Sequence, residues 1–176
     1  IHVHLAQGES EILYFGDFAR ENYSGSFQMN EEKVLNLKWD IVLKESGVDS
    51  AWKPYKKEAA LENITGKNAK PDFSGEIYYQ TKLMLKESGA YRLSLGKVGH
   101  TAKLKVNGKE LGIRISEPYD WDVSEVLKPG ENVIEVIVAN TLVNRIHDNF
   151  SVYLQLPPSG ISGPVVLKKG KKTERQ

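Results

Sequence analysis

The sequence predicts an all-β fold, an antiparallel β-sandwich. Short segments of alternating apolar and polar residues follow one another from residue 76 to residue 167. Glycine, proline and asparagine separate these segments, and almost no stretch has helical periodicity. Short strands joined by tight turns are typical of two antiparallel sheets packed face to face.

The composition excludes several classes of protein. The chain has 176 residues, enough for one ordinary domain with flanking sequence. Its 24 basic and 23 acidic residues nearly cancel, so no overall field attracts nucleic acid or an anionic membrane. No apolar run approaches the roughly 20 residues that span a bilayer. We therefore expect neither nucleic acid nor membrane as a partner.

The first 32 residues predict two elements outside the main domain. Residues 1–18 alternate as an edge hairpin around the turn at residues 7–10, and the chain begins with Ile1 rather than methionine, as a piece of a longer polypeptide would. Residues 19–32 are rich in asparagine, serine, glycine and acidic residues, which is typical of a linker.

The main domain is predicted over residues 33–168, followed by a basic tail over residues 169–176. Its first strand is expected within residues 34–43, and a short helix within residues 56–63. The further strands are expected at residues 77–85, 90–95, 102–106, 109–115, 133–139, 152–156 and 165–167.

Local motifs support these elements. Asn107-Gly108 supplies the two positive φ angles of a type I′ turn, so the segments on either side should form a hairpin. Residues 91–95 alternate so that one sheet face is apolar and the other polar. Asp122 is placed to cap a single helical turn, with Glu125 at the third position after it.

The order and spacing of the turn segments resemble one family. The segments are Phe73-Ser74-Gly75, Val106-Asn107-Gly108-Lys109, Lys128-Pro129-Gly130-Glu131-Asn132, Asn140-Thr141-Leu142-Val143-Asn144-Arg145 and Ser159-Gly160-Ile161-Ser162-Gly163-Pro164. They are similar to the galactose-binding-like jelly-roll domain, or sugar-binding domain, of glycoside hydrolases. The family 106 α-L-rhamnosidases are the nearer resemblance and family 2 the more distant one, because the arginine common in family 2 shortly after Ser-Gly-Ile is missing here.

The resemblance implies a function as well as a fold. It implies a non-catalytic, carbohydrate-binding-like accessory domain of a secreted or periplasmic glycoside hydrolase, packing on or supplementing the catalytic module. Its partners would be plant or microbial polysaccharide and the other domains of the parent enzyme, and residues 1–18 would be the edge of a preceding β-domain. No cofactor is implied, and a structural calcium ion stays an open alternative that the sequence cannot place. An independent lectin-like module and a purely structural interaction domain are the rival interpretations.

Catalysis by this chain alone is not expected. A glycosidase needs two carboxyl groups about 5 to 9.5 Å apart, and the sequence pairs none in a recognisable motif. In the resembling families the catalytic pair lies on a (β/α)₈ barrel elsewhere in the polypeptide, and this chain has no alternation of strands and helices. Cysteine is absent, which excludes thiol nucleophiles and thiolate metal ligands. We assign no catalytic residue and no metal site.

A carbohydrate contact is predicted at a loop that follows a strand. Sugar hydroxyls need convergent polar side chains, and five fall within nine residues: Asn140, Asn144, Arg145, His147 and Asp148. The first three match the Asn-x-x-x-Asn-Arg segment of the resembling family. The alternative is that the asparagine amides satisfy backbone groups within the loop.

Aromatic residues offer a second location. Trp52 and Tyr55 lie in the irregular stretch before the main strands and are expected to be exposed, where packing against another domain would explain them equally well. Trp39 and Trp121 are in phase with inward-facing residues, so both are expected in the core.

Overall fold

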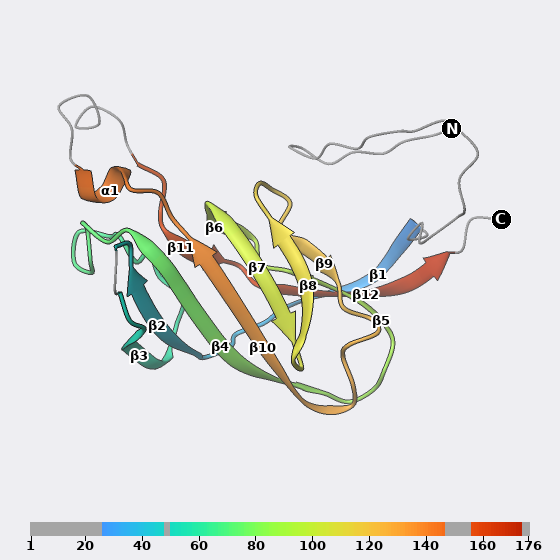
Figure 1. Ribbon diagram of the computed structural model, residues 1–176. Helices are drawn as coiled ribbons and strands as arrows, with labels where there is room; N and C mark the ends of the chain where they lie inside the picture. Colours follow the sequence, from blue (N-terminus) through green and yellow to red (C-terminus); the bar gives the residue numbers. More distant parts are fainter. Residues whose placement is uncertain (1–25, 48–49, 147–155, 174–176) are drawn as a thin grey trace, which may run out of the picture.

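The computed structural model describes residues 26–47, 50–146 and 156–173, and it confirms the all-β, antiparallel architecture (Figure 1). The edge hairpin predicted over residues 1–18 and most of the strand predicted over residues 152–156 lie outside the described residues.

The larger layer is a six-stranded antiparallel sheet with the order β3-β2-β4-β10-β7-β8. Its strands are β2 (Trp39–Glu45), β3 (Lys53–Ala59), β4 (Gly75–Leu85), β7 (Thr101–Val106), β8 (Lys109–Arg114) and β10 (Gly130–Ala139). The central pair, β4 and β10, runs from Gly130 opposite Leu85 to Ala139 opposite Glu76 without a break in register. This long unbroken ladder makes the sheet a rigid platform.

The second layer is a four-stranded antiparallel sheet with the order β1-β12-β5-β9. Its strands are β1 (Ser26–Val34), β5 (Ala90–Ser94), β9 (Asp120–Asp122) and β12 (Val166–Thr173). Strands β6 (Lys97–Gly99) and β11 (Gly160–Gly163) form a separate pair, and one helical turn, α1 (Val143–Ile146), follows β10. Figure 1 shows β1 and β12 running together away from the sandwich.

The core lies between the two layers because every second residue points inward on β4, β5, β7 and β10. On β10 the buried apolar residues are Ile134, Val136 and Val138, and the residues between them are half-buried. Trp39 and Trp121 are 1% and 2% exposed, which confirms that both belong to the core. Burial of large apolar side chains of this kind contributes about 1.5–3 kcal/mol each.

The polar stretches at the two ends of the domain form strands, contrary to their expected character as linker and tail. Residues 26–32 belong to β1, and residues 169–173 belong to β12. The two strands pair so that Glu31 lies opposite Lys169 and Glu32 opposite Lys168, and opposite charges across a ladder are favourable. The division into a preceding hairpin, a linker and a main domain stays a prediction.

The prediction of a short helix over residues 56–63 is wrong, because residues 53–59 form β3 instead. This strand pairs with β2 through two register shifts, and the N–H of Glu58 donates to Asp40 Oδ1 at 3.0 Å. The irregular pairing interrupts the alternation that identifies a strand in sequence. The predicted strand over residues 34–43 is likewise divided, since residues 35–38 separate β1 from β2.

Two predicted local motifs are confirmed. Asn107 and Gly108 have φ angles of 50° and 84°, and they join β7 to β8. The Asn107 side chain accepts from the N–H of Val133 at 2.9 Å and donates to the carbonyl of Val126 at 2.7 Å. Asp122 caps its turn by accepting from the N–H of Ser124 at 3.0 Å.

Substituting Gly108 tests the hairpin. A Cβ at Gly108 would meet no atom within 4 Å, so backbone strain at positive φ is the whole effect. We expect Gly108→Val to lower the free energy of unfolding by about 1–3 kcal/mol, because a β-branched residue resists this conformation. Gly108→Asn is the control and should cost less, since asparagine tolerates the left-handed region. Equal denaturation midpoints for the two variants would contradict the turn assignment.

Candidate functional site

A polar cluster, buried at Asn144 and Ser159, anchors the loop that is predicted to contact sugar. We call it the Ser159 cluster, and it consists of Asn63, Asn140, Asn144 and Ser159. The Asn140 Nδ2 lies 3.1 Å from Ser159 Oγ, and the Asn144 Nδ2 lies 3.5 Å from the same oxygen. Asn63 Oδ1 accepts from the Ser159 N–H at 2.9 Å. Three amides from two different loops therefore converge on one serine.

Asn140 also holds the start of β4. Its Oδ1 accepts from the N–H of Gly75 at 2.7 Å, and its Nδ2 donates to the carbonyl of Phe73 at 2.8 Å. A buried backbone group without a partner is costly, so these bonds stabilise the approach of the chain to β4. Asn140 and Asn144 thus have a structural use here, whatever contact they make with a ligand.

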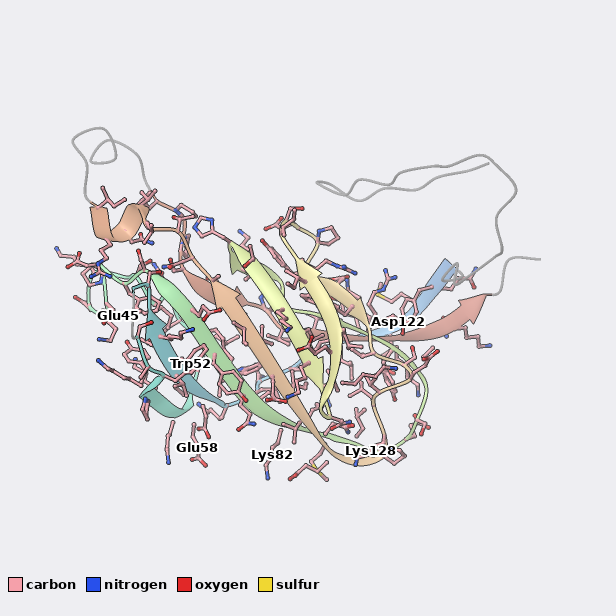
Figure 2. The ribbon with its side chains drawn as sticks, viewed as in Figure 1. Glu45, Trp52, Glu58, Lys82, Asp122 and Lys128 are labelled. Atoms are coloured by element: carbon pink, nitrogen blue, oxygen red, sulfur yellow. The ribbon has the colours of Figure 1, made fainter. Side chains whose placement is uncertain are left out.

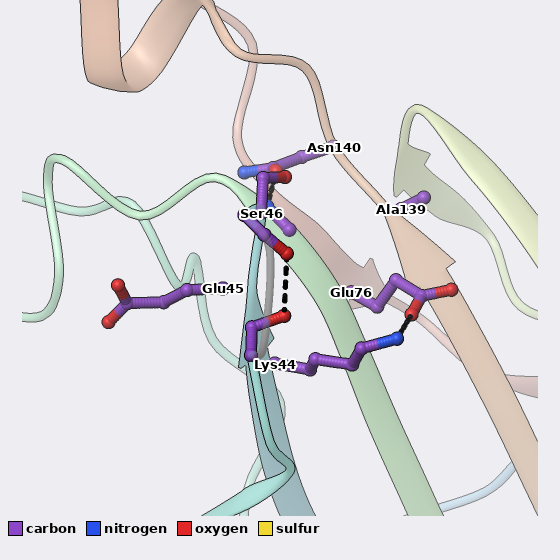
Figure 3. A pocket seen from close by; sticks show the side chains of 9 residues that line it. Lys44, Glu45, Ser46, Glu76, Ala139 and Asn140 are labelled. Atoms are coloured by element: carbon purple, nitrogen blue, oxygen red, sulfur yellow. Dashed lines mark hydrogen bonds and ion pairs between the residues drawn. The ribbon is translucent and has the colours of Figure 1, made fainter.

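A pocket of about 320 Å³ opens beside this cluster (Figure 3). It lies where β2 ends, β4 begins and β10 ends. The lining residues are Lys44, Glu45, Ser46, Gly47, Ser50, Gly75, Glu76, Ala139 and Asn140.

An ion pair crosses one side of the pocket. Lys44 and Glu76 occupy directly opposed positions on β2 and β4, and Lys44 Nζ lies 3.0 Å from Glu76 Oε2. Figure 3 shows this pair as a dashed line, with the Glu45 side chain pointing away from Lys44. Both side chains of the pair are partly exposed, so a ligand in the pocket can reach them.

Trp52 extends the site onto the outer face of the six-stranded sheet (Figure 2). The Lys44 ammonium lies 5.6 Å from the centre of the Trp52 ring, within the range of a cation–π contact. Trp52 is 41% exposed, which confirms its expected exposure. Lys44 therefore joins an exposed aromatic ring to the charged pair of the pocket.

Tyr78 supports Trp52 from β4. The two rings meet edge to face, with centres 6.1 Å apart and an interplanar angle of 69°. The Tyr78 hydroxyl donates to Glu135 Oε1 at 2.7 Å. Burial, and then the hydrogen bond to Glu135, raise the pKa of the Tyr78 hydroxyl. Tyr78 therefore remains a neutral donor at physiological pH, and its ring position is fixed.

The structure brings some of the predicted site residues together and separates others. Trp52 and Asn140 flank the pocket, and Arg145 Nη1 donates to the carbonyl of Ser46, a lining residue, at 2.6 Å. Asn144 is 4% exposed and belongs to the Ser159 cluster.

Tyr55 does not line the pocket. Tyr55 is not openly exposed as expected but half-buried against the core, with its hydroxyl 3.3 Å from Glu62 Oε1. This difference follows from β3, which turns Tyr55 toward the sandwich. His147 and Asp148 lie outside the described residues.

Sequence reasoning missed Lys44, Ser46 and Glu76. All three lie more than 60 positions before Asn140 in the sequence. Taken alone, each is an ordinary polar or charged residue. The only signal is the pairing of β2 with β4, which places Lys44 opposite Glu76. That register depends on tertiary structure and could not be read from residue spacing.

Across residues 26–47, 50–146 and 156–173, no three histidine, aspartate or glutamate side chains are grouped so that they could hold a metal ion. In the same part of the chain, no helix has the length and apolar character needed to cross a membrane.

Comparison with known proteins finds similarity to parts of larger enzymes. No protein-family model matches the chain. A putative β-glucuronidase of Formosa agariphila is 30% identical in an alignment 158 residues long, which covers 81% of this chain and 13% of that protein. The chain therefore spans about an eighth of the length of this curated relative.

Solved structures with the same sandwich include parts of glycoside hydrolases. A rhamnosidase from a Novosphingobium species has 23% identity and a TM-score of 0.61, covering 82% of this chain and 16% of the enzyme. A β-D-glucuronidase from Dictyoglomus thermophilum has 22% identity and a TM-score of 0.55, covering 84% and 29%. A family 2 β-galacturonidase from Eisenbergiella tayi has 22% identity and a TM-score of 0.54, covering 81% and 25%. These likenesses show a shared fold, and the chain corresponds to a small part of each enzyme.

Removing the Asn140 amide tests the Ser159 cluster. We expect Asn140→Ala to lower the free energy of unfolding by about 2–4 kcal/mol, because it leaves buried partners at Phe73, Gly75 and Ser159 without their hydrogen bonds. The neighbouring Thr141→Ala is the control, since the Thr141 side chain is exposed, and should stay within about 0.5 kcal/mol. Chemical denaturation measures the free energy of unfolding of both variants. A loss in Asn140→Ala no larger than the loss in Thr141→Ala would show that the Ser159 cluster contributes little to stability.

Proposed function

We propose that this chain is a non-catalytic, carbohydrate-binding-like accessory domain of a glycoside hydrolase. The strongest support is that the similarity covers most of this chain but only a small part of a much longer relative. Similarity extends over 81% of this chain but over 13% of the putative β-glucuronidase from Formosa agariphila. The domain would pack on the catalytic module of its parent and present the pocket beside Lys44 and Glu76 to carbohydrate.

The proposed parent enzyme is α-L-rhamnosidase-like, of the family 106 type. The turn at residues 159–164, which lacks the arginine of the family 2 pattern, supports this choice. The TM-score of 0.61 with the Novosphingobium rhamnosidase, against 0.54 with the family 2 β-galacturonidase, is in accord with it. A parent acting on glucuronides is the second candidate, and the 30% identity to the putative β-glucuronidase favours it.

The proposed partners are a plant or microbial polysaccharide and the other domains of the parent. Polysaccharides of this kind lie outside the cell, so we propose a secreted or periplasmic location. The nearly balanced charge of the chain supports the exclusion of nucleic acid and membrane as partners. We propose no cofactor.

A binding role and a purely structural role make different demands on the pocket. A lectin-like module needs an exposed aromatic ring beside convergent polar groups, and Trp52, Lys44 and Glu76 meet that description. A structural lobe needs only a surface that fits its neighbour. The sandwich fold serves both roles in different proteins. A binding role therefore has to be inferred from the side chains of the site and not from the fold.

The isolated chain should be inactive on glycosides. We expect no turnover of an aryl glycoside panel that includes the α-L-rhamnoside and the β-D-glucuronide, because the catalytic carboxyl pair of the parent is proposed to lie in another domain. Release of the chromophore measures activity. Turnover that survives repurification and disappears in Glu76→Gln or Glu135→Gln would overturn the non-catalytic assignment, and an unrelated β-sandwich protein purified in parallel controls for contaminating hydrolases.

A further inference from the structure

We infer that the pocket beside Lys44 and Glu76 takes a neutral, hydroxyl-rich sugar ring and discriminates against a uronic acid. This inference rests on the proposed carbohydrate role and specifies the ligand class. The names of several similar enzymes refer to glucuronides and galacturonides. The charges of the pocket point to a different ligand for this domain.

The pocket has no unmatched positive charge among its lining residues. They include one lysine, Lys44, and two glutamates, Glu45 and Glu76. The Lys44 ammonium is already 3.0 Å from Glu76 Oε2. A ligand carboxylate that approached Lys44 would also approach Glu76, and like charges at short range repel. Binding a uronate would therefore require Glu76 to move away from Lys44.

The nearby arginine does not reverse this balance. Arg145 is not among the lining residues, and its Nη1 is bound to the carbonyl of Ser46 at 2.6 Å. Its guanidinium thus fixes the backbone at the rim of the pocket. Because Arg145 does not line the pocket, a carboxylate seated between Lys44 and Glu76 would have no guanidinium among the groups that surround it.

A sugar hydroxyl suits the ion pair without disturbing it. A hydroxyl can donate and accept at the same time, whereas an ionised carboxylate only accepts and an ammonium only donates. One hydroxyl can therefore donate to Glu76 while it accepts from Lys44. Hydrogen bonds to charged partners are stronger than neutral ones, so the pair is an effective clamp for adjacent hydroxyls.

Apolar surface beside the pair suits the C–H groups of the same ring. Trp52 is 41% exposed, and its ring centre is 5.6 Å from Lys44 Nζ. The methyl group of Ala139 lines the pocket on the side of β10. A pyranose is polar at its hydroxyls and apolar along its C–H groups, and the site offers both kinds of surface within the reach of one ring.

The pocket is held in shape before any ligand arrives. A Cβ at Gly75 would lie 2.0 Å from the carbonyl oxygen of Lys44, so only glycine lets β4 begin this close to β2. Asn140 Oδ1 fixes the N–H of Gly75 at 2.7 Å. A preformed site loses less conformational entropy on binding, which favours even a small ligand.

The test compares sugars that differ in charge. Methyl β-D-glucopyranoside and methyl β-D-glucuronide form one matched pair, the corresponding galactosides form a second, and methyl α-L-rhamnopyranoside is a further neutral probe. Backbone amide shifts of the labelled full chain report both affinity and location. We expect shifts at residues 44–47, 75–76 and 139–140 with a neutral probe, a Kd on the order of 1 mM, and binding of its uronide partner weaker by roughly fivefold or more.

The variant Glu76→Gln gives the sharper result. Loss of the carboxylate frees the Lys44 ammonium, so we expect the neutral probe to bind about threefold to tenfold more weakly and the uronide to bind more tightly than to the unaltered chain. Glu131→Gln is the matched control, because Glu131 makes a similar cross-strand pair with Lys82 at 3.1 Å outside the pocket. Figure 2 places Lys82 at the opposite end of the sheet from Glu45. The control variant should bind the neutral probe and the uronide with the same affinities as the unaltered chain.

Each contrary outcome has a distinct meaning. A uronide that binds the unaltered chain as tightly as its neutral partner would overturn the inference and leave the proposed carbohydrate role intact, as would shifts confined to another surface. Absence of shifts with every probe would overturn the inference and favour the structural lobe. Trp52→Ala gives a second test should Glu76→Gln fail to fold, and unchanged affinity for the neutral probe in that variant would also contradict the site.

Discussion

The arrangement of this site depends on the buried hydroxyl of Ser159. Side-chain amides of Asn140 and Asn144 reach it from one loop, and Asn63 binds the Ser159 N–H from another. The strands end here, so their last backbone groups have lost their ladder partners and need others. The Ser159 cluster supplies them, and Asn140 also extends to Gly75 and Phe73. The ladders join the ends of β2, β4 and β10, and these bonds tie the loops that follow and precede them to the same place.

This constraint changes the roles of the residues first considered for binding. Asparagine side chains in a strand-end loop suggest hydroxyl recognition, yet here they are largely occupied by the protein itself. The side chains that a ligand can reach are nearer the surface, and they are Lys44, Glu76 and Trp52. The buried amides position the strand ends, and the strand ends position the charged pair. The proposed binding surface and its support are therefore built from different residues.

Charged pairs of this kind contribute little to stability. Exposed ion pairs typically contribute up to about 1 kcal/mol, so the fold does not depend on Lys44 and Glu76. Their importance is geometric, because directly opposed positions on β2 and β4 hold a donor and an acceptor at a fixed separation. Tyr78 fixes the neighbouring Trp52 ring in the same way, through an edge contact and a hydrogen bond to Glu135. Such a surface is in accord with the proposed carbohydrate-binding role.

The sequence by itself determined the features that depend on neighbours along the chain. Alternation identified β4, β5, β7, β8 and β10 and the inward tryptophans, Asn107-Gly108 identified the hairpin, and Asp122 identified its capped turn, because each is decided within a few residues. Tertiary structure alone decided the pairing of polar β1 with β12, the irregular strand β3 that half-buries Tyr55, and the pocket. Polar strands and bulges lack the alternation of apolar and polar residues by which a strand is recognised in a sequence. A pocket between three strand ends depends on register, and register is set by the packing of the whole sandwich.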